Sequence, residues 1–316
     1  MLVNGTWTTN WKPSDGKDPS GAFIRPTSSF RSFVTPDGEP GPTGDGGFAA
    51  AAGRYHLYVG LICPWASRTL AARALKGLEA VISVTIVDPA MTDEGWRFTD
   101  APDTGPDPLY GAHYLHQIYT RADPHFTGRA TIPVLWDKQR QTIVNNESAD
   151  ILRILNSGFG SLAKTDIDLY PDALREEIDA LNARIYPRLN NGVYRAGFAA
   201  TQAAYEAAFK DVFAELDALE AHLSTRTFLV GERLTEADIR LFVTLVRFDA
   251  AYHGLFKCNR RRLADYAKLS AYVKRVIALP GIRPTVNIDH IKRGYYSLKA
   301  LNPSGIVPAG PDLDWA

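Results

Sequence analysis

The feature that most constrains the fold is a buried strand that leads through a cysteine and a proline into a helix. The apolar, β-prone run over residues 55–62 predicts the strand. Pro64 suits the first position of a helix over residues 65–76, where apolar residues recur at helical spacing. Residues 81–87 predict a second strand. The sequence therefore predicts a β-α-β unit with Cys63 at its strand-to-helix junction.

The rest of the chain divides into a mixed α/β half and a helical half. In the first half, a polar, Pro/Gly-rich segment of unusual length is followed by a strand pair and by a helix that residues 145–148 cap. In the second half, apolar residues at spacings of three and four predict four amphipathic helices, and Thr235 with Asp238 resembles a capping box. The boundary between the halves falls near residues 157–171. The predicted organisation is an arm over 1–50, an α/β domain over 51–160 with an insertion at about 89–128, a helical domain over 172–300 and a tail over 301–316.

The N-terminal arm, residues 1–50, shows no periodic pattern and is rich in small and polar residues. Five aromatic residues within positions 7–33 are unusual for a solvated tail, so we expect an extended segment that lies over the folded body. The expected anchors are Trp7, Trp11, Phe23, Phe30 and Phe33.

Length, charge and cysteine content exclude several classes of protein. A chain of 316 residues suggests two domains and needs no disulfide or metal to fold. Lys plus Arg equals Asp plus Glu at 35 each, which argues against a nucleic-acid binder or a binder of anionic membranes. Only two cysteines, no signal-peptide pattern and no long apolar stretch lead us to expect a cytoplasmic protein.

Cys63 is the strongest candidate for a reactive group. The start of a helix offers free backbone N–H groups and a partial positive charge, which stabilise a thiolate. Ala66 stands where a Cys-x-x-Cys motif has its second thiol, so no local disulfide can form. Any sulfur–sulfur intermediate at Cys63 must therefore be resolved by a thiol from outside. Cys258, in the helical half, is expected to be structural.

A second signal lies at the predicted strand pair. Thioredoxin-like folds place a cis-proline opposite the cysteine of the first β-α-β unit, and Pro133 stands at the head of the first strand of the pair. Glu147 and Ser148 supply a carboxylate and a hydroxyl at the start of the next helix. They are either simple capping residues or part of a site for a small zwitterionic peptide.

Other polar groups carry weaker signals. His113 and His116 lie three residues apart, but no ligand partner accompanies them at metal spacing, so we expect no metal site. The basic run over residues 260–262 is expected to be a solvated or ligand-steering patch. By composition alone, Tyr194 and Tyr295 are ordinary core aromatics.

Taken together, the motifs resemble the glutathionyl-hydroquinone reductases, also called Xi-class glutathione transferases, over nearly the whole chain. The matching segments are 61–68 (LICPWASR), 94–96 (EGW), 131–137 (TIPVLWD), 143–148 (IVNNES), 191–198 (NGVYRAGF), 256–259 (FKCN), 290–296 (HIKRGYY), 302–303 (NP) and 305–308 (GIVP). The Cys-Pro-Trp-Ala motif together with the Tyr-Tyr pair is more specific than the general transferase pattern. Members of the family often carry His where this chain has Gly294.

The resemblance implies a glutathione transferase fold, with an N-terminal thioredoxin-like domain and a C-terminal helical bundle. It also implies a set of glutathione-binding residues: Trp96, Arg129, Val134, Glu147 and Ser148. Tyr194 and Tyr295 are implied to face the quinol and to act with Cys63 in catalysis, with Tyr296 as the adjacent alternative.

The implied reaction is the glutathione-dependent reduction of glutathionyl-hydroquinones to hydroquinones. It passes through a mixed disulfide between Cys63 and glutathione, which a second glutathione releases as glutathione disulfide. Glutathione is then a co-substrate, and no permanently bound cofactor is expected. The implied partners are glutathione and glutathionylated quinols, and the family habit is a homodimer. The alternatives are an omega-type thioltransferase or dehydroascorbate reductase, which needs Cys63 but not the tyrosines, and a non-catalytic protein that binds glutathione or quinones.

Overall fold

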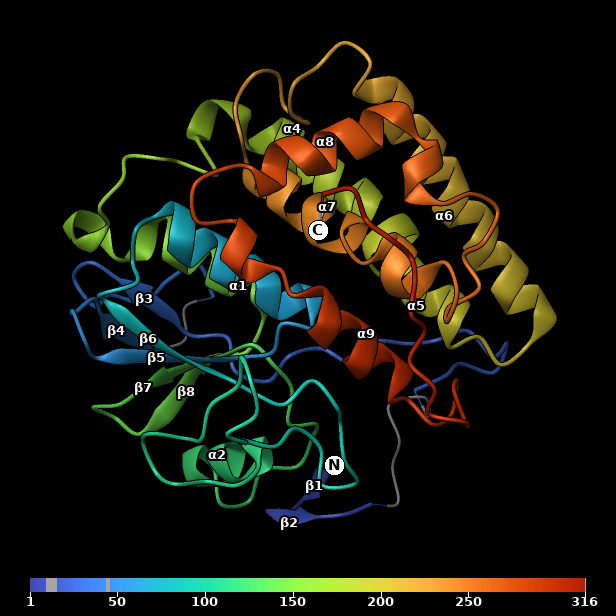
Figure 1. The fold of residues 1–316 in the computed structure, drawn as a ribbon. Helices are drawn as coiled ribbons and strands as arrows, with labels where there is room; N and C mark the ends of the chain where they lie inside the picture. The colour runs from blue at the N-terminus through green and yellow to red at the C-terminus, as the bar shows by residue number, and fades with distance from the viewer. Residues whose placement is uncertain (10–15, 44–45, 316) are drawn as a thin grey trace. The chain divides into compact units, whose positions relative to one another are not determined.

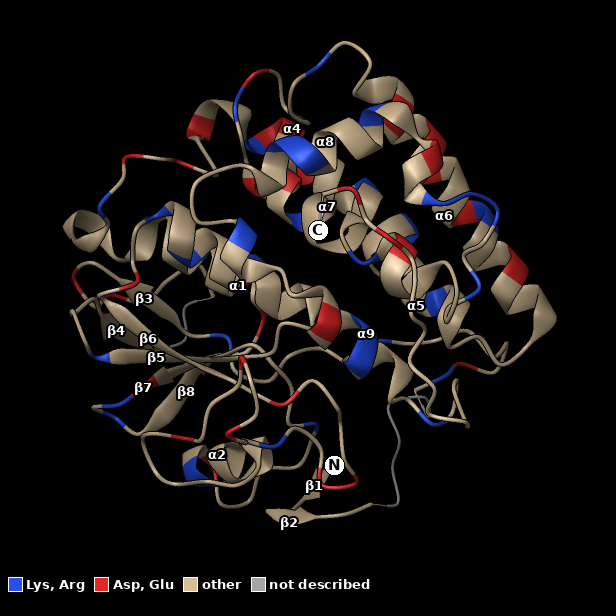
Figure 2. Cartoon of the chain, in the orientation of Figure 1, with Lys and Arg blue, Asp and Glu red and all other residues tan. Residues whose placement is uncertain are grey.

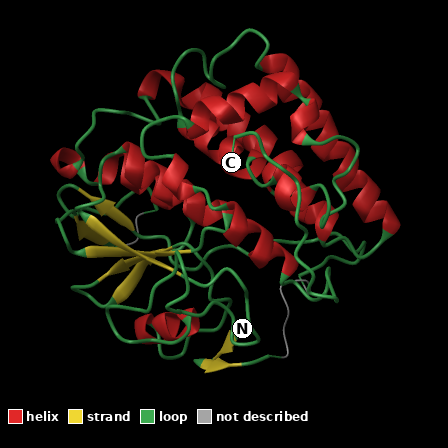
Figure 3. Cartoon of the chain, viewed as in Figure 1, coloured by secondary structure: helices red, strands yellow, loops and turns green. Residues whose placement is uncertain are grey.

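The computed structural model describes residues 1–9, 16–43 and 46–315, so Trp11 lies outside the described residues. The chain forms two compact units, and both draw on the N-terminal arm (Figure 1). The first comprises Met1–Lys12 and Thr27–Ile167, and the second Pro13–Pro26 and Asp168–Ala316. The named strands lie in the first unit, and the second is built from helices (Figure 3).

A four-stranded mixed sheet forms the centre of the first unit. Its strands, in spatial order, are β6 (Ile82–Ile86), β5 (Tyr55–Val59), β7 (Val134–Asp137) and β8 (Thr142–Asn145). β5 is buried along its whole length, pairs in parallel with β6 and pairs antiparallel with β7. The parallel pair requires a crossover, and α1 (Pro64–Leu75) supplies it. The predicted β-α-β unit is therefore confirmed.

Two of the predicted strands are shorter than the apolar runs that predicted them. β5 ends at Val59, and the next residues form a turn in which the Cys63 amide donates to the Gly60 carbonyl at 3.0 Å. β7 begins at Val134 instead of Thr131, because Pro133 has no N–H group to donate to a neighbouring strand. Both changes place residues of the predicted site at the ends of strands instead of within them.

The segment over residues 89–128 is an ordered insertion with one helix, α2 (Leu115–Ala122). Its start is fastened by an ion pair of 3.0 Å between Arg97 and Asp88. The Leu115 amide donates to the Trp96 carbonyl at 2.8 Å, which ties the start of α2 to the turn that carries Trp96. The insertion therefore holds the Trp96 backbone in one place.

The arm forms short strands, and each of the two units contains a different part of it. Strands β1 (Leu2–Val3) and β2 (Thr6–Trp7) make a hairpin, and β3 (Phe33–Thr35) pairs in parallel with β4 (Gly47–Ala49). The Trp7 ring stacks on His116 in the first unit, with centroids 4.6 Å apart. The other described anchors also pack: Phe23 contacts Phe198 within the second unit, and Phe30 contacts Phe126 within the first, while Phe33 is buried.

Among its described residues, the second unit contains six α-helices with short helical turns between them. They are α4 (Arg175–Ile185), α5 (Gly192–Gly197), α6 (Gln202–His222), α7 (Glu236–Leu245), α8 (Ala267–Ile277) and α9 (Ile288–Tyr296). The capping box predicted at the start of α7 is present, since the Asp238 carboxylate accepts from the Thr235 amide at 2.8 Å. The single helix predicted over residues 235–251 is interrupted after Leu245 and resumes as a π-helical turn over Phe248–Tyr252.

Among the helices of the described residues, none has the length and apolar character needed to cross a bilayer.

Candidate active site

Cys63 occupies the residue immediately before α1, outside both the sheet and the helix. Its backbone is extended, with φ −80° and ψ 118°, and its carbonyl accepts the Ser67 amide at 3.0 Å as the first hydrogen bond of the helix. The side chain is partly exposed, and Sγ lies 3.8 Å from the Ile132 carbonyl oxygen. The peptide bond that follows Ile132 is cis, as the thioredoxin-like pattern predicts. Cys63 therefore faces the cis-proline end of β7.

Cys63 is also the accessible one of the two thiols in the chain. Ala66, in the position of a resolving cysteine, is completely buried in α1. Cys258 has no exposed surface, and its burial raises the pKa of its thiol to about 12. A buried thiol with a raised pKa is a poor nucleophile, because the thiolate is the reactive form.

The residues after β8 form a second part of the site in the same unit. Glu147 precedes α3 (Ser148–Arg153), and its Oε1 accepts the Ala149 amide at 3.1 Å. The Ser148 hydroxyl is buried and accepts from Arg68 at 3.4 Å. Arg68 lies one turn into α1, with its guanidinium 4.5 Å from the centre of the Trp65 ring. It therefore connects the helix that follows Cys63 to Ser148.

The remaining predicted glutathione-binding residues also lie in the first unit. Val134 is the first residue of β7 and is fully buried. Trp96 is partly exposed on the insertion. Arg129 follows Gly128, which exchanges two backbone hydrogen bonds with Leu2 of the arm. Burial, and then the positive charge of Arg129, lower the pKa of the Met1 ammonium.

In the second unit, three tyrosine hydroxyls meet. The Tyr194 hydroxyl, on α5, lies 2.5 Å from that of Tyr295 on α9, and the Tyr252 hydroxyl lies 2.9 Å from the same atom. All three side chains are buried or nearly so. Burial, and then the neighbouring phenol of Tyr194, raise the pKa of Tyr295 and of Tyr252 well above the ordinary value. This tyrosine cluster is thus a set of neutral phenols linked by hydrogen bonds.

Tyr296 does not join the tyrosine cluster. It is partly exposed, and its hydroxyl lies close to Gly254. Of the two adjacent tyrosines, Tyr295 is therefore the one that the structure brings to Tyr194.

Comparisons with known proteins identify the family of the chain. The model of the glutathione S-transferase N-terminal domain matches residues 62–157, and that of the C-terminal domain matches residues 202–275. The glutathionyl-hydroquinone reductase PcpF of Sphingobium chlorophenolicum is 53% identical over 98% of this chain and 96% of its own length. The glutathionyl-hydroquinone reductase YqjG of Escherichia coli is 51% identical over 99% of this chain and 96% of its own.

Solved structures agree as well. The glutathione-bound structure of YqjG is 48% identical, covers 99% of this chain and 96% of its own, and superposes with a TM-score of 0.91. The glutathione transferase Xi of Phanerochaete chrysosporium is 46% identical, covers 93% and 94%, and has a TM-score of 0.89. The chain belongs to the Xi class of glutathione transferases. The fold predicted from the sequence, a thioredoxin-like domain followed by a helical domain, is confirmed.

Sequence reasoning missed two residues that the structure of this Xi-class transferase brings to the candidate groups. Tyr252 lies in the π-helical turn after α7, where an aromatic residue signals core packing and nothing more. Arg68 stands in the motif that carries Cys63, yet its contact with Ser148 spans 80 residues of sequence. Long-range pairs of this kind leave no local periodic signal.

The basic run over residues 260–262 is balanced by nearby carboxylates. Arg260 and Arg261 pair with Asp217 on α6, at 2.6 and 3.9 Å, and Arg262 pairs with Asp265 at 2.9 Å. Figure 2 shows this basic loop beside acidic residues of α6. The positive charge at this place is therefore largely neutralised, in agreement with a solvated patch.

The difference in exposure between the two thiols makes a direct prediction. Iodoacetamide added to the native protein at neutral pH should alkylate Cys63 and leave Cys258 unmodified, because only Cys63 reaches solvent. Peptide mass spectrometry measures both sites in one digest, and the urea-unfolded protein, in which both thiols should react, is the control. Equal labelling of the two residues in the native protein would contradict the exposure described here.

Proposed function

We propose that this chain reduces glutathionyl-hydroquinones to hydroquinones at the expense of glutathione, with Cys63 as the nucleophile. The observation that carries the proposal is the placement of Cys63: an accessible thiol at a helix start, facing a cis-proline, with a buried alanine where a resolving thiol would stand. The similarity to PcpF and YqjG, both named glutathionyl-hydroquinone reductases, supports the choice of substrate.

In the first step, the Cys63 thiolate attacks the sulfur of the glutathionyl group. A sulfur–sulfur bond forms and the bond between sulfur and the aromatic carbon breaks, so both electrons of that bond remain with the ring. The ring carbon then takes up a proton and the hydroquinone leaves. The ring has gained two electrons, and the two sulfur atoms, now joined as a mixed disulfide, have lost them.

In the second step, a free glutathione thiolate attacks the glutathionyl sulfur of the mixed disulfide. Glutathione disulfide leaves and the Cys63 thiolate is restored. The overall reaction consumes one glutathionyl-hydroquinone and one glutathione and produces one hydroquinone and one glutathione disulfide, with the ring proton supplied by the glutathione thiol. The lack of a thiol at Ala66 suits this route, because an internal disulfide cannot compete with the second glutathione.

We propose that the tyrosine cluster recognises the quinol and assists the proton transfer. A neutral phenol both donates and accepts a hydrogen bond, so Tyr194 and Tyr295 can bind quinol oxygens and donate a proton. The raised pKa of Tyr295 keeps its proton in place at neutral pH. Tyr252, hydrogen-bonded to Tyr295, can orient that hydroxyl and replace the proton that it gives up.

Glutathione itself is proposed to bind through the first unit. The Val134 backbone lies at the cis-proline end of β7, where an extended peptide can pair with it. The Glu147 carboxylate is proposed to accept a hydrogen bond from the γ-glutamyl ammonium, and the Ser148 hydroxyl to donate one to the γ-glutamyl carboxylate, with Trp96 and Arg129 assisting from the insertion. A cytoplasmic location and a homodimer, the latter implied by the family, complete the proposal. The two reduced cysteines fit a reducing compartment.

Substitution of the nucleophile tests the first step. Cys63→Ser should lower kcat/KM for a glutathionyl-hydroquinone by at least about a thousandfold, because a serine cannot form the mixed disulfide. The unaltered protein, mixed with substrate in the absence of free glutathione, should gain one glutathionyl group on the peptide that holds Cys63. Cys258→Ser is the matched control and should keep the adduct. Full activity of Cys63→Ser would show that the mechanism is wrong.

The tyrosine cluster distinguishes the proposed reductase from a general thioltransferase. Tyr194→Phe combined with Tyr295→Phe should lower turnover of a glutathionyl-hydroquinone about a hundredfold, because the quinol loses its hydrogen-bonding and proton-donating groups. Reduction of a small glutathione mixed disulfide should be spared. Tyr205→Phe, whose hydroxyl only binds the Lys257 carbonyl, is the control.

Equal losses on both substrates would assign the tyrosines a structural role and favour the omega-type alternative. Loss of quinol turnover in Tyr296→Phe, with Tyr295→Phe unaffected, would move the proposed contact to the other tyrosine.

A further inference from the structure

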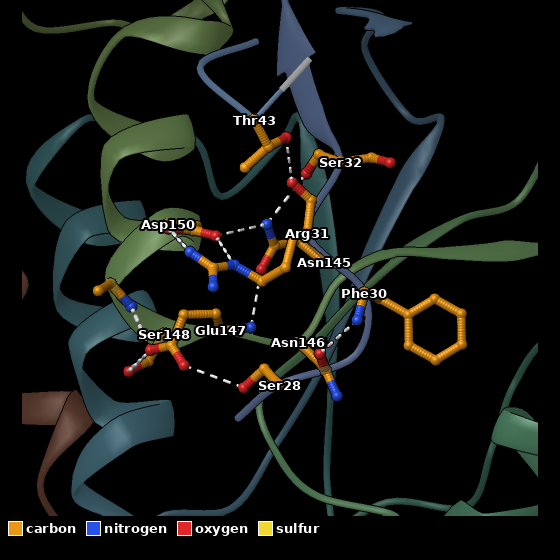
Figure 4. Close-up of polar contacts among 11 residues, drawn as sticks. Ser28, Phe30, Arg31, Ser32, Thr43, Asn145, Asn146, Glu147, Ser148 and Asp150 are labelled. Atoms are coloured by element: carbon orange, nitrogen blue, oxygen red, sulfur yellow. Dashed lines mark hydrogen bonds and ion pairs between the residues drawn. The ribbon is translucent and has the colours of Figure 1, made fainter. Parts of the chain in front are cut away.

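A segment of the arm, Ser28 to Ser32, lies along the residues that follow β8. The Phe30 amide donates to Asn146 Oδ1 at 3.0 Å, and the Asn146 amide donates back to the Phe30 carbonyl at 3.0 Å (Figure 4). Arg31 forms an isolated β-bridge with Asn145. The arm therefore pairs with the end of β8 through one antiparallel β-bridge and two adjoining hydrogen bonds, immediately before Glu147.

Ser28 places a hydroxyl on the carboxylate of Glu147. Its Oγ donates to Glu147 Oε2 at 2.9 Å, as Figure 4 shows, although the two residues are 119 positions apart. The other carboxylate oxygen, Oε1, accepts the Ala149 amide at 3.1 Å and the Ser148 hydroxyl at 3.4 Å. Ser28 is thus the group that fixes the oxygen facing away from the helix.

The acceptor capacity of the carboxylate leaves room for a ligand. An ionised carboxylate has about four lone-pair sites. The hydrogen bonds from Ser28 and Ala149 occupy one site on each oxygen, and at least one of the remaining sites is open to a further donor whether or not the Ser148 hydroxyl, at 3.4 Å, uses the other. Because Ser28 and Ala149 hold opposite oxygens, the carboxylate plane is fixed before any ligand arrives, which lowers the ordering cost of binding.

Two further contacts hold the arm segment in this place. Arg31 forms a double hydrogen bond with Asp150, through Nε and through Nη2, the latter at 2.9 Å. Asn145 donates to the Ser32 carbonyl at 3.0 Å and accepts the Glu147 amide at 2.7 Å, so it joins the arm to Glu147 directly. Arg31 also neutralises the charge of Asp150. Among Arg31, Asp150 and Glu147, the net negative charge therefore comes from Glu147, which suits the binding of an ammonium group.

We propose that Ser28 is a positioning residue for the γ-glutamyl ammonium of glutathione, acting through the Glu147 carboxylate. The inference rests on the proposed function and assigns to the N-terminal arm a role in substrate binding. Ser28 does not touch the reacting sulfur. It therefore affects the affinity for glutathione and not the chemical step.

The test compares the unaltered chain with a variant at Ser28, using two ligands of which one lacks the γ-glutamyl ammonium. S-methylglutathione and the analogue in which a glutaryl group replaces the γ-glutamyl group, and which therefore has no ammonium, are titrated calorimetrically into the full chain. Ser28→Ala should weaken binding of S-methylglutathione about three- to tenfold, because the net contribution of a typical hydrogen bond corresponds to a change of this size. It should change binding of the glutaryl analogue by less than about twofold, because the ammonium–carboxylate contact is already absent.

The controls separate positioning from a general loosening of the arm. Ser28→Thr, which keeps the hydroxyl, should restore affinity. Ser29→Ala, at an exposed neighbour whose hydroxyl has no hydrogen-bond partner among the described residues, should have no effect. In steady-state assays Ser28→Ala should raise KM for the glutathionyl-hydroquinone, whose glutathionyl group occupies the proposed site, and leave kcat within about twofold.

Each other result overturns the inference in a distinguishable way. Equal weakening of both ligands would show that Ser28 acts through the fold and not through the ammonium contact. Unchanged affinity for S-methylglutathione in Ser28→Ala would remove Ser28 from the site while leaving the proposed function intact. If the unaltered chain bound neither ligand, the proposed glutathione site itself would be wrong.

Discussion

The position of one thiol, between the end of a buried strand and the first turn of a helix, is the constraint on which the rest of this structure depends. The sheet fixes the strand, Pro64 starts the helix, and Cys63 remains outside both, with its side chain toward the cis-proline end of β7. The same local sequence that makes the crossover therefore leaves an accessible thiol at its start.

The two units contribute different chemistry to the proposed reaction. The first holds a charged and partly exposed set of groups, in which Glu147 and Ser148 are fixed by contacts from the arm and from α1. The second holds buried phenols whose protons are retained because burial disfavours the phenolate. A zwitterionic peptide suits the first environment and a neutral aromatic diol the second.

Much of the fold could be predicted because its signals are local. The β-α-β unit follows from an apolar run, a proline and a helical repeat within about thirty residues, and the capping box at Thr235 needs only four. The short helices α5 and α9 were not predicted, because one turn or two of helix carries too little periodicity. The arm was predicted to lie over the body, but its division between two units depends on pairing with segments far away in the sequence.

Prediction of the candidate site from the sequence is likewise limited to residues with local signals. Cys63 can be singled out from its neighbours alone, whereas Tyr194 and Tyr295 could be proposed only through the family resemblance. Their hydroxyl contact joins residues 101 positions apart. Ser28 and Tyr252 gave no signal, because a serine in a polar arm and a tyrosine in a helical turn are common in any protein. Their proposed roles can be inferred only from the atoms that they contact in the structure.

The central claim is that the reaction takes place at the sulfur of the substrate, through the Cys63 thiolate. The most direct measurement is a steady-state comparison of a glutathionyl-hydroquinone with an aryl halide, the ordinary substrate for glutathione conjugation, with both products quantified. The account predicts that the glutathionyl-hydroquinone is turned over with one glutathione disulfide formed for each hydroquinone, and that conjugation of the aryl halide is slower by orders of magnitude. Efficient conjugation without formation of glutathione disulfide would contradict it.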